Sequence, residues 1–201
     1  NPPLSSKYFA ACADCPGFEA ELAKKKTQRI RVMSSAFAPP FSAKKSAKTR
    51  MLIQNKIIAV LTINDSNKIL DLAKCLYNSG IINLDIRLRT KESKNAIEKI
   101  INSDYNFNIG VGTVLNSEDL NFVSSLGIKY AFSPHTDESI INLSNKLKVD
   151  FIPGVSNEDD IRKSIKCGCN YLKYIPAEKL GGINYLNSIT KAFEKISLNF
   201  I

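Results

Sequence analysis

Residues 84–90 carry the strongest indication of this chain's architecture; they read Leu84-Asp85-Ile86-Arg87-Leu88-Arg89-Thr90. Apolar and charged residues alternate here, and a β-strand sends successive side chains to opposite faces. Asp85, Arg87 and Arg89 therefore share one face. In a barrel the apolar face packs outward against helices, so the three charges are predicted to point into the interior. A carboxylate buried between guanidinium groups is costly unless it is paired or used, which indicates a functional site.

From about residue 55 onward, short apolar runs alternate with amphipathic stretches, as in repeated βα units. The predicted strands are 56–63, 82–88, 108–114, 130–133, 150–155, 171–175 and 197–201. The predicted helices lie near 65–79, 92–103, 117–125, 137–147, 157–167 and 182–195. Asp65 and the polar runs 116–119 and 156–160 carry N-cap and first-turn signals for helix starts. This order predicts a parallel sheet with right-handed crossovers.

Seven such strands suit either an open doubly wound sheet or a (β/α)8 TIM barrel. The segment Ile63-Asn64-Asp65 after the first strand carries no Gly-x-Gly-x-x-Gly pattern, which disfavours the dinucleotide-binding fold. Polar residues instead follow several strands, where a barrel has its active-site face: 85–89, Thr113, 133–135 and 173–178. We therefore expect an α/β (β/α)8 TIM barrel, truncated within strand 7 at Ile201.

The basic charge of the chain lies mostly in its first fifty residues. The formal net charge is +9, and residues 1–50 hold ten Lys or Arg against three Asp or Glu. This Ser- and Lys-rich extension is interpreted as an organelle transit region or as a basic tail, with the barrel over 51–201. Ala36-Phe37-Ala38-Pro39 resembles the junction in presequences of algae with secondary plastids, so plastid stroma and cytoplasm both stay open.

Two further classes of protein receive little support. No run of about eighteen apolar residues exists, so no membrane-spanning helix is expected. A nucleic-acid or membrane-surface binder would depend on residues 24–50 alone, and we expect neither partner.

The five cysteines include the half-motif Cys12-x-x-Cys15, but the sole histidine is His135. We expect free thiols and no metal site.

Lys173 is the outstanding residue of the strand predicted over 171–175, because it is a single amine in an otherwise apolar run. Burial favours an uncharged amine, which is the form that attacks a carbonyl to make a Schiff base. A nearby carboxylate such as Asp85 can then move protons. A solvated or salt-bridged lysine is the alternative, and the strand pattern alone leaves both interpretations of Lys173 open.

Six motifs now carry a specific resemblance; in chain order they are residues 56–61, 84–90, 110–114, 132–135, 152–155 and 172–178. Over residues 55–201 the chain resembles the class I 2-keto-3-deoxy-6-phosphogluconate (KDPG) and 4-hydroxy-2-oxoglutarate (KHG) aldolases. The resemblance implies a carbon–carbon lyase of the Entner–Doudoroff pathway. Such an enzyme reversibly cleaves KDPG to pyruvate and glyceraldehyde 3-phosphate, and it can cleave KHG to pyruvate and glyoxylate. It works as a homotrimer without cofactor or metal.

The resemblance also implies site residues. Lys173 falls on the Schiff-base lysine, and Asp85 falls where the family carries a glutamate as general acid and base. Arg89 and Thr113 fall on positions that hold the pyruvyl carboxylate, which suits a guanidinium. Pro134 and Ile175 are expected as pocket walls. Gly181 and Gly182 are expected to supply part of the phosphate contact.

Three departures keep a second hypothesis open. Asp85 is one methylene shorter than the expected glutamate, Arg87 adds an inward cation, and Ile201 precedes the Gly-Gly loop and the last βα unit. A fragment of a longer aldolase explains the last point. The alternative is an aldolase-like scaffold without catalysis.

Overall fold

The computed structural model describes residues 28–34 and 57–201, except residues 195 and 197. The Cys12–Cys15 half-motif, the Ala36–Pro39 stretch and most of the interpreted transit region lie outside the described residues. Among the helices of the described part, none has the length and apolar character that crossing a membrane requires.

Strands and helices alternate along the chain from residue 57 onward. The strands are β1 (Gln28–Ser34), β2 (Ile57–Ile63), β3 (Asn83–Arg87), β4 (Asn108–Gly112), β5 (Tyr130–Phe132), β6 (Asp150–Ile152), β7 (Gly154–Val155), β8 (Tyr171–Tyr174) and β9 (Asn199–Phe200). The α-helices are α4 (Ile69–Asn78), α5 (Ser93–Ile101), α6 (Ser117–Ser125), α7 (Glu138–Leu147), α8 (Glu158–Lys166) and α9 (Gly182–Thr190). Two 3₁₀ turns are η1 (Ser66–Lys68) and η2 (Lys191–Phe193).

The predicted helix starts are confirmed by their capping bonds. The side chain of Asp65 accepts from the backbone N–H of Asn67 at 3.0 Å. The side chain of Asn116 accepts from the backbone N–H of Asp119 at 2.8 Å, and that of Asn157 accepts from the N–H of Asp160 at 3.0 Å. Each bond satisfies one of the N–H groups that a helix start leaves without an internal partner.

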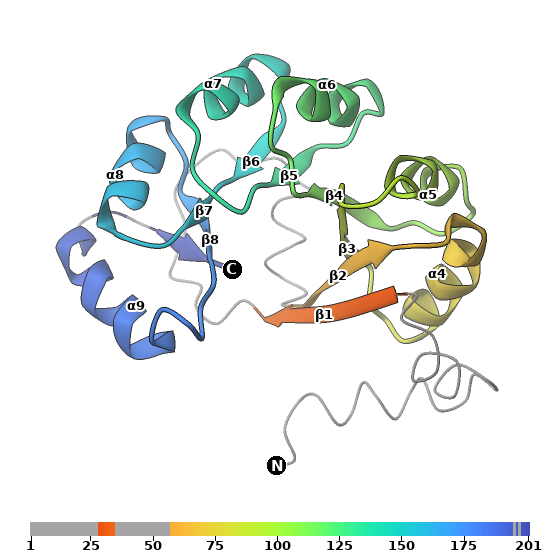
Figure 1. Ribbon diagram of the computed structural model, residues 1–201, viewed down its shortest axis with the longest axis horizontal. Coiled ribbons are helices and arrows are strands. Elements are labelled where there is room, and N and C mark those ends of the chain that lie inside the picture. The colour runs from red at the N-terminus through yellow and green to blue at the C-terminus, as the bar shows by residue number, and fades with distance from the viewer. Residues whose placement is uncertain (1–27, 35–56, 195, 197) are drawn as a thin grey trace, which may run out of the picture.

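All strands from β2 to β9 run parallel, as predicted. Sheet order follows chain order from β2 to β6 and again from β7 to β9. The helices form an outer layer around this curved row of strands (Figure 1). The arrangement is that of a (β/α) barrel, but the barrel is not closed, because among the described residues no ladder joins β9 to β2.

Two details differ from the predicted strands. The strand predicted over 150–155 is interrupted at Pro153, which has no N–H to donate to a ladder. The carbonyl of Pro153 still accepts from the N–H of Lys173 at 2.9 Å, so β8 continues the barrel wall. In addition, β1 pairs antiparallel with β2 (Figure 1). No strand was predicted over these residues, because residues 1–50 show no sustained amphipathic period.

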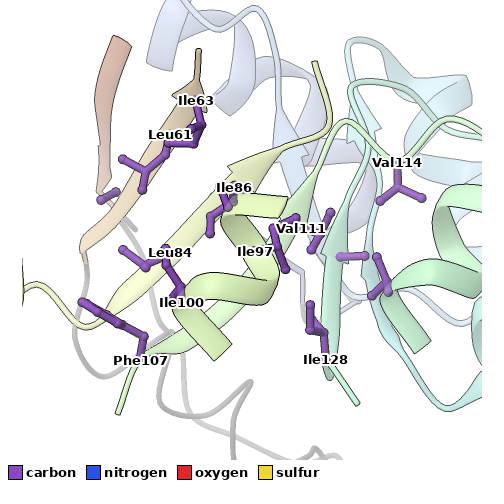
Figure 2. Packing of buried hydrophobic residues seen from close by; sticks show 14 of the residues in the cluster. Leu61, Ile63, Leu84, Ile86, Ile97, Ile100, Phe107, Val111, Val114 and Ile128 are labelled. Atoms are coloured by element: carbon purple, nitrogen blue, oxygen red, sulfur yellow. The ribbon is translucent and has the colours of Figure 1, made fainter. Parts of the chain in front are cut away.

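The two faces of each strand contribute to different cores. Outward-facing side chains of β2 to β5 pack against α4 to α7 in one large cluster (Figure 2). Inward-facing side chains form a second cluster inside the barrel, made of Ile58, Tyr130, Phe132, Ile152 and Tyr171. The separation follows from the two-residue period of a strand. It leaves the interior free to hold polar groups without weakening the helix–sheet contact.

Tyr130 connects three strands from inside the barrel. It is fully buried, and its hydroxyl donates to the backbone carbonyls of Leu84, at 3.2 Å, and of Asn108. Its ring meets that of Phe132 edge-on, with centroids 5.5 Å apart. Burial, and secondarily the charge of Asp85, raises the pKa of Tyr130 well above its ordinary value. The hydroxyl therefore stays a donor.

Removing this hydroxyl should destabilise the fold. We expect Tyr130→Phe to lower the free energy of unfolding by about 1–3 kcal/mol, because two strand carbonyls lose a buried donor. Urea denaturation followed by circular dichroism measures the change. Tyr77→Phe is the matched control, since Tyr77 is 39% exposed and its hydroxyl should contribute less than about 0.5 kcal/mol. Equal effects of the two substitutions would contradict this account of Tyr130.

Candidate active site

Strand register brings the predicted charged residues together at one level of the barrel. In β3 the inward positions are Asn83, Asp85 and Arg87, while Leu84 and Ile86 belong to the outer cluster. Lys173 lies on β8, 88 residues further along the chain. The sequence prediction that Asp85 and Arg87 are inward and buried is confirmed, because their exposures are 0% and 9%.

Asp85 and Lys173 form a buried ion pair. The Lys173 Nζ atom donates to Asp85 Oδ2 at 3.1 Å, and the lysine is only 5% exposed. The same nitrogen lies 5.0 Å from the ring centroid of Phe132, where an aromatic face attracts a cation. Asp85 Oδ1 is buried without a hydrogen-bond partner among the described residues. The pair thus leaves the second carboxylate oxygen without a hydrogen bond from the described part of the barrel.

This contact supplies both a nucleophile and a proton carrier. Attack on a carbonyl needs the neutral amine, and Asp85 Oδ2 lies at hydrogen-bond distance to take the proton from Lys173 Nζ. The amine can then attack a carbonyl carbon, and the acid can return the proton to the oxygen that leaves. The arrangement is suited to forming a Schiff base.

Arg89 and Thr113 meet at the same end of the barrel. Arg89 Nε donates to Thr113 Oγ1 at 3.2 Å. Arg89 is exposed, so the expectation that it shares the buried interior with Asp85 is wrong. It lies beyond the end of β3 (Asn83–Arg87), where strand alternation no longer directs the side chain. Its guanidinium therefore faces the mouth of the site.

Thr113 has a left-handed backbone, with a φ of 61°. This region is unfavourable for a β-branched residue and is found mainly where function requires it. The conformation ends β4 at Gly112 and directs the Thr113 hydroxyl to Arg89. The strain is consistent with a binding position for an anion, since it fixes a guanidinium and a hydroxyl side by side.

Pro134 and Ile175 are both half-buried; Ile175 follows β8 directly, and Ser133 separates Pro134 from the end of β5. The backbone of Pro134 lies tightly against Gly154, where an added Cβ would come within 2.3 Å of the Pro134 carbonyl. Both residues therefore lie near the C-terminal ends of strands, and their role as pocket walls stays a prediction.

Gly181 and Gly182 lead into α9, but their amides are already used. The N–H of Gly181 donates to Glu178 O at 3.2 Å, and the N–H of Gly182 donates to Ala177 O at 2.8 Å. A phosphate contact through these two amides would have to replace both bonds. The sequence could not predict these two amide bonds, because they depend on how the loop between β8 and α9 folds back on itself.

The sequence patterns did not predict that Tyr130, Phe132 and Gly112 lie next to the ion pair. The alternation Tyr130-Ala131-Phe132 contained the signal for the two aromatics, since it places both rings on the inner face. Across the described residues, no three His, Cys, Asp or Glu side chains gather as a metal site would need.

Comparisons with known proteins identify one family. The model of the family described as "KDPG and KHG aldolase" matches residues 49–200. A 2-dehydro-3-deoxy-phosphogluconate aldolase of Pseudoalteromonas atlantica is 32% identical over 144 residues, covering 72% of this chain and 67% of that protein.

Solved structures of the same kind are also similar. The 2-keto-3-deoxy-6-phosphogluconate aldolase of Zymomonas mobilis ZM4, solved with 3-phosphoglycerate, is 28% identical at a TM-score of 0.67. The match covers 71% of this chain and 67% of that one. The KDPG aldolase of Legionella pneumophila, with pyruvate captured as a covalent carbinolamine, is 31% identical at a TM-score of 0.67. That match covers 71% of this chain and 68% of the other.

The ion pair has a consequence for stability. We expect Lys173→Met to lower the free energy of unfolding by about 3–5 kcal/mol, because Asp85 is left buried and unpaired. The double variant Lys173→Met/Asp85→Leu should recover most of this loss, as a double-mutant cycle in urea would show. Glu158→Ala is the control, since it removes the exposed pair with Arg162, and exposed pairs contribute under about 1 kcal/mol. A small effect of Lys173→Met would contradict the burial described for this pair.

Proposed function

This chain belongs to the KDPG and KHG aldolase family, and we propose that it is a class I aldolase whose Schiff base forms on Lys173. The reaction is the reversible cleavage of KDPG to pyruvate and glyceraldehyde 3-phosphate, with KHG as a second substrate giving pyruvate and glyoxylate. The observation that carries the proposal is the 3.1 Å contact between Lys173 Nζ and Asp85 Oδ2 inside the barrel.

Covalent attachment begins at the keto carbon of the substrate. The neutral Lys173 amine attacks C2, and Asp85 gives a proton to the resulting hydroxyl so that water leaves. A positively charged iminium remains, and it stays beside the Asp85 carboxylate and the Phe132 ring. Both neighbours stabilise a cation at this nitrogen.

Cleavage of the C3–C4 bond follows. Asp85 removes the proton of the C4 hydroxyl, the bond breaks to release an aldehyde, and the electron pair moves into the iminium to give an enamine. Asp85 then returns the proton to C3, and water releases pyruvate from Lys173. One residue thus acts as acid and base in turn.

Substrate anions are assigned to the mouth of the barrel. We propose that Arg89 and Thr113 bind the carboxylate next to the keto group, since their contact at 3.2 Å aligns a guanidinium and a hydroxyl. Pro134 and Ile175 flank the bound chain of the substrate. Gly181 and Gly182 take part in phosphate binding only if their present amide bonds are exchanged for it.

Borohydride reduction in the presence of pyruvate tests the assignment. We expect one reduced pyruvyl adduct at Lys173 by peptide mass mapping, and cleavage of KDPG that lactate dehydrogenase reports as pyruvate. Lys173→Arg should abolish both while the protein stays folded, because a guanidinium keeps the charge beside Asp85 but does not lose its proton. The matched control, Lys146→Arg, changes an exposed lysine. An adduct elsewhere, or none, would favour the non-catalytic scaffold.

We also propose that the chain works as a homotrimer, as its family resemblance implies. Sedimentation velocity at micromolar concentration should give the mass of three chains of 22.3 kDa each. Because a closed ring of identical contacts depends on concentration, dilution should shift the distribution toward monomer. A single species of monomer mass across the whole concentration range would contradict the proposal.

A further inference from the structure

The inward face of β4 carries two glycines opposite the charges of β3. Strand register pairs Asp85 with Gly110 and Arg87 with Gly112. Val111, between them, belongs to the outer cluster. Glycine weakens a strand interior, so two of them on one face indicate that other groups approach the backbone closely.

Different side chains occupy the space beside each glycine. A Cβ added at Gly110 would lie 1.9 Å from Cε2 of Tyr130, within the aromatic ring. A Cβ added at Gly112 would lie 2.0 Å from Asp85 Oδ1 and 2.9 Å from its Cγ. The Asp85 carboxylate therefore rests directly on the backbone of β4, in the volume that any other residue at 112 would fill.

We propose that Gly112 is a positioning residue for the aldolase reaction, acting through Asp85; this inference rests on the function proposed above. The missing Cβ of Gly112 leaves a space, the carboxylate seat, that the Asp85 carboxylate fills. From this position Oδ2 reaches Lys173 Nζ at 3.1 Å. Aspartate has one methylene less than glutamate, so its carboxylate stays close to the sheet. Contact with the β4 backbone in this seat directs the Asp85 carboxylate toward Lys173 on β8.

The two glycines should respond differently to the same substitution. At Gly112 the obstructed group is the end of a side chain, so Asp85 can rotate away while the fold is kept. At Gly110 the obstructed group is a ring held by Leu84 and Asn108 carbonyls and by the edge-on contact with Phe132. The first substitution should affect chemistry and the second should affect stability.

The experiment compares Gly112→Ala with Gly110→Ala. For Gly112→Ala we expect kcat for KDPG cleavage to fall about 100-fold, since a misplacement of about 1 Å costs that much, with KM changed less than threefold. Exchange of the pyruvate C3 protons in D₂O should slow in parallel, because Asp85 carries that proton. For Gly110→Ala we expect a larger drop in the urea midpoint, with kcat per folded molecule within threefold of the unsubstituted chain.

A second variant separates the effect of the contact between Gly112 and Asp85 from a general loss of structure. In an Asp85→Ala background the seat is empty, so adding Gly112→Ala should change neither the exchange rate nor the urea midpoint. A further loss in that background, or unchanged kcat and exchange in Gly112→Ala alone, would overturn the proposal. If the unsubstituted chain itself forms no adduct at Lys173, the proposed function fails, while the urea cycle between positions 85 and 112 still tests the seat.

Discussion

The buried ion pair between Lys173 and Asp85 is the constraint on which the rest of the interior depends. Two charges placed inside a barrel cost several kcal/mol each unless they meet in good geometry. Here the contact is 3.1 Å, an aromatic ring lies beside the cation, and glycine makes room for the anion. The aromatic ring stabilises the Lys173 cation, and the absence of a Cβ at Gly112 leaves space for the Asp85 carboxylate.

The scaffold can hold such a pair because its stability comes from elsewhere. Leu84 and Ile86 on the outer face of β3 pack against helices in the large cluster, while Asp85 and Arg87 lie buried on the inner face. Tyr130 then connects β3, β4 and β5 below the site. Because the two faces of β3 differ in this way, one strand contributes both to the apolar core and to the charged interior.

Much of the fold and part of the site could be predicted from local pattern. The helix starts at Asn116 and Asn157 follow from capping chemistry, and the burial of Asp85 and Lys173 follows from alternation within apolar strands. The exposure of Arg89 could not be predicted, since the strand ends before it. The occupied amides of Gly181 and Gly182 depend on how one loop turns, which residue type alone does not specify.

The sequence by itself determined the alternation of strands and helices, the parallel order of the strands and the burial of Lys173, because these depend on periods of two and 3.6 residues and on one charge among apolar neighbours. Tertiary structure alone decided that Lys173 meets Asp85 across 88 residues, and that the carboxylate rests on Gly112. Such contacts depend on the register between strands. Register is a property of several segments packed together, and no single segment contains it.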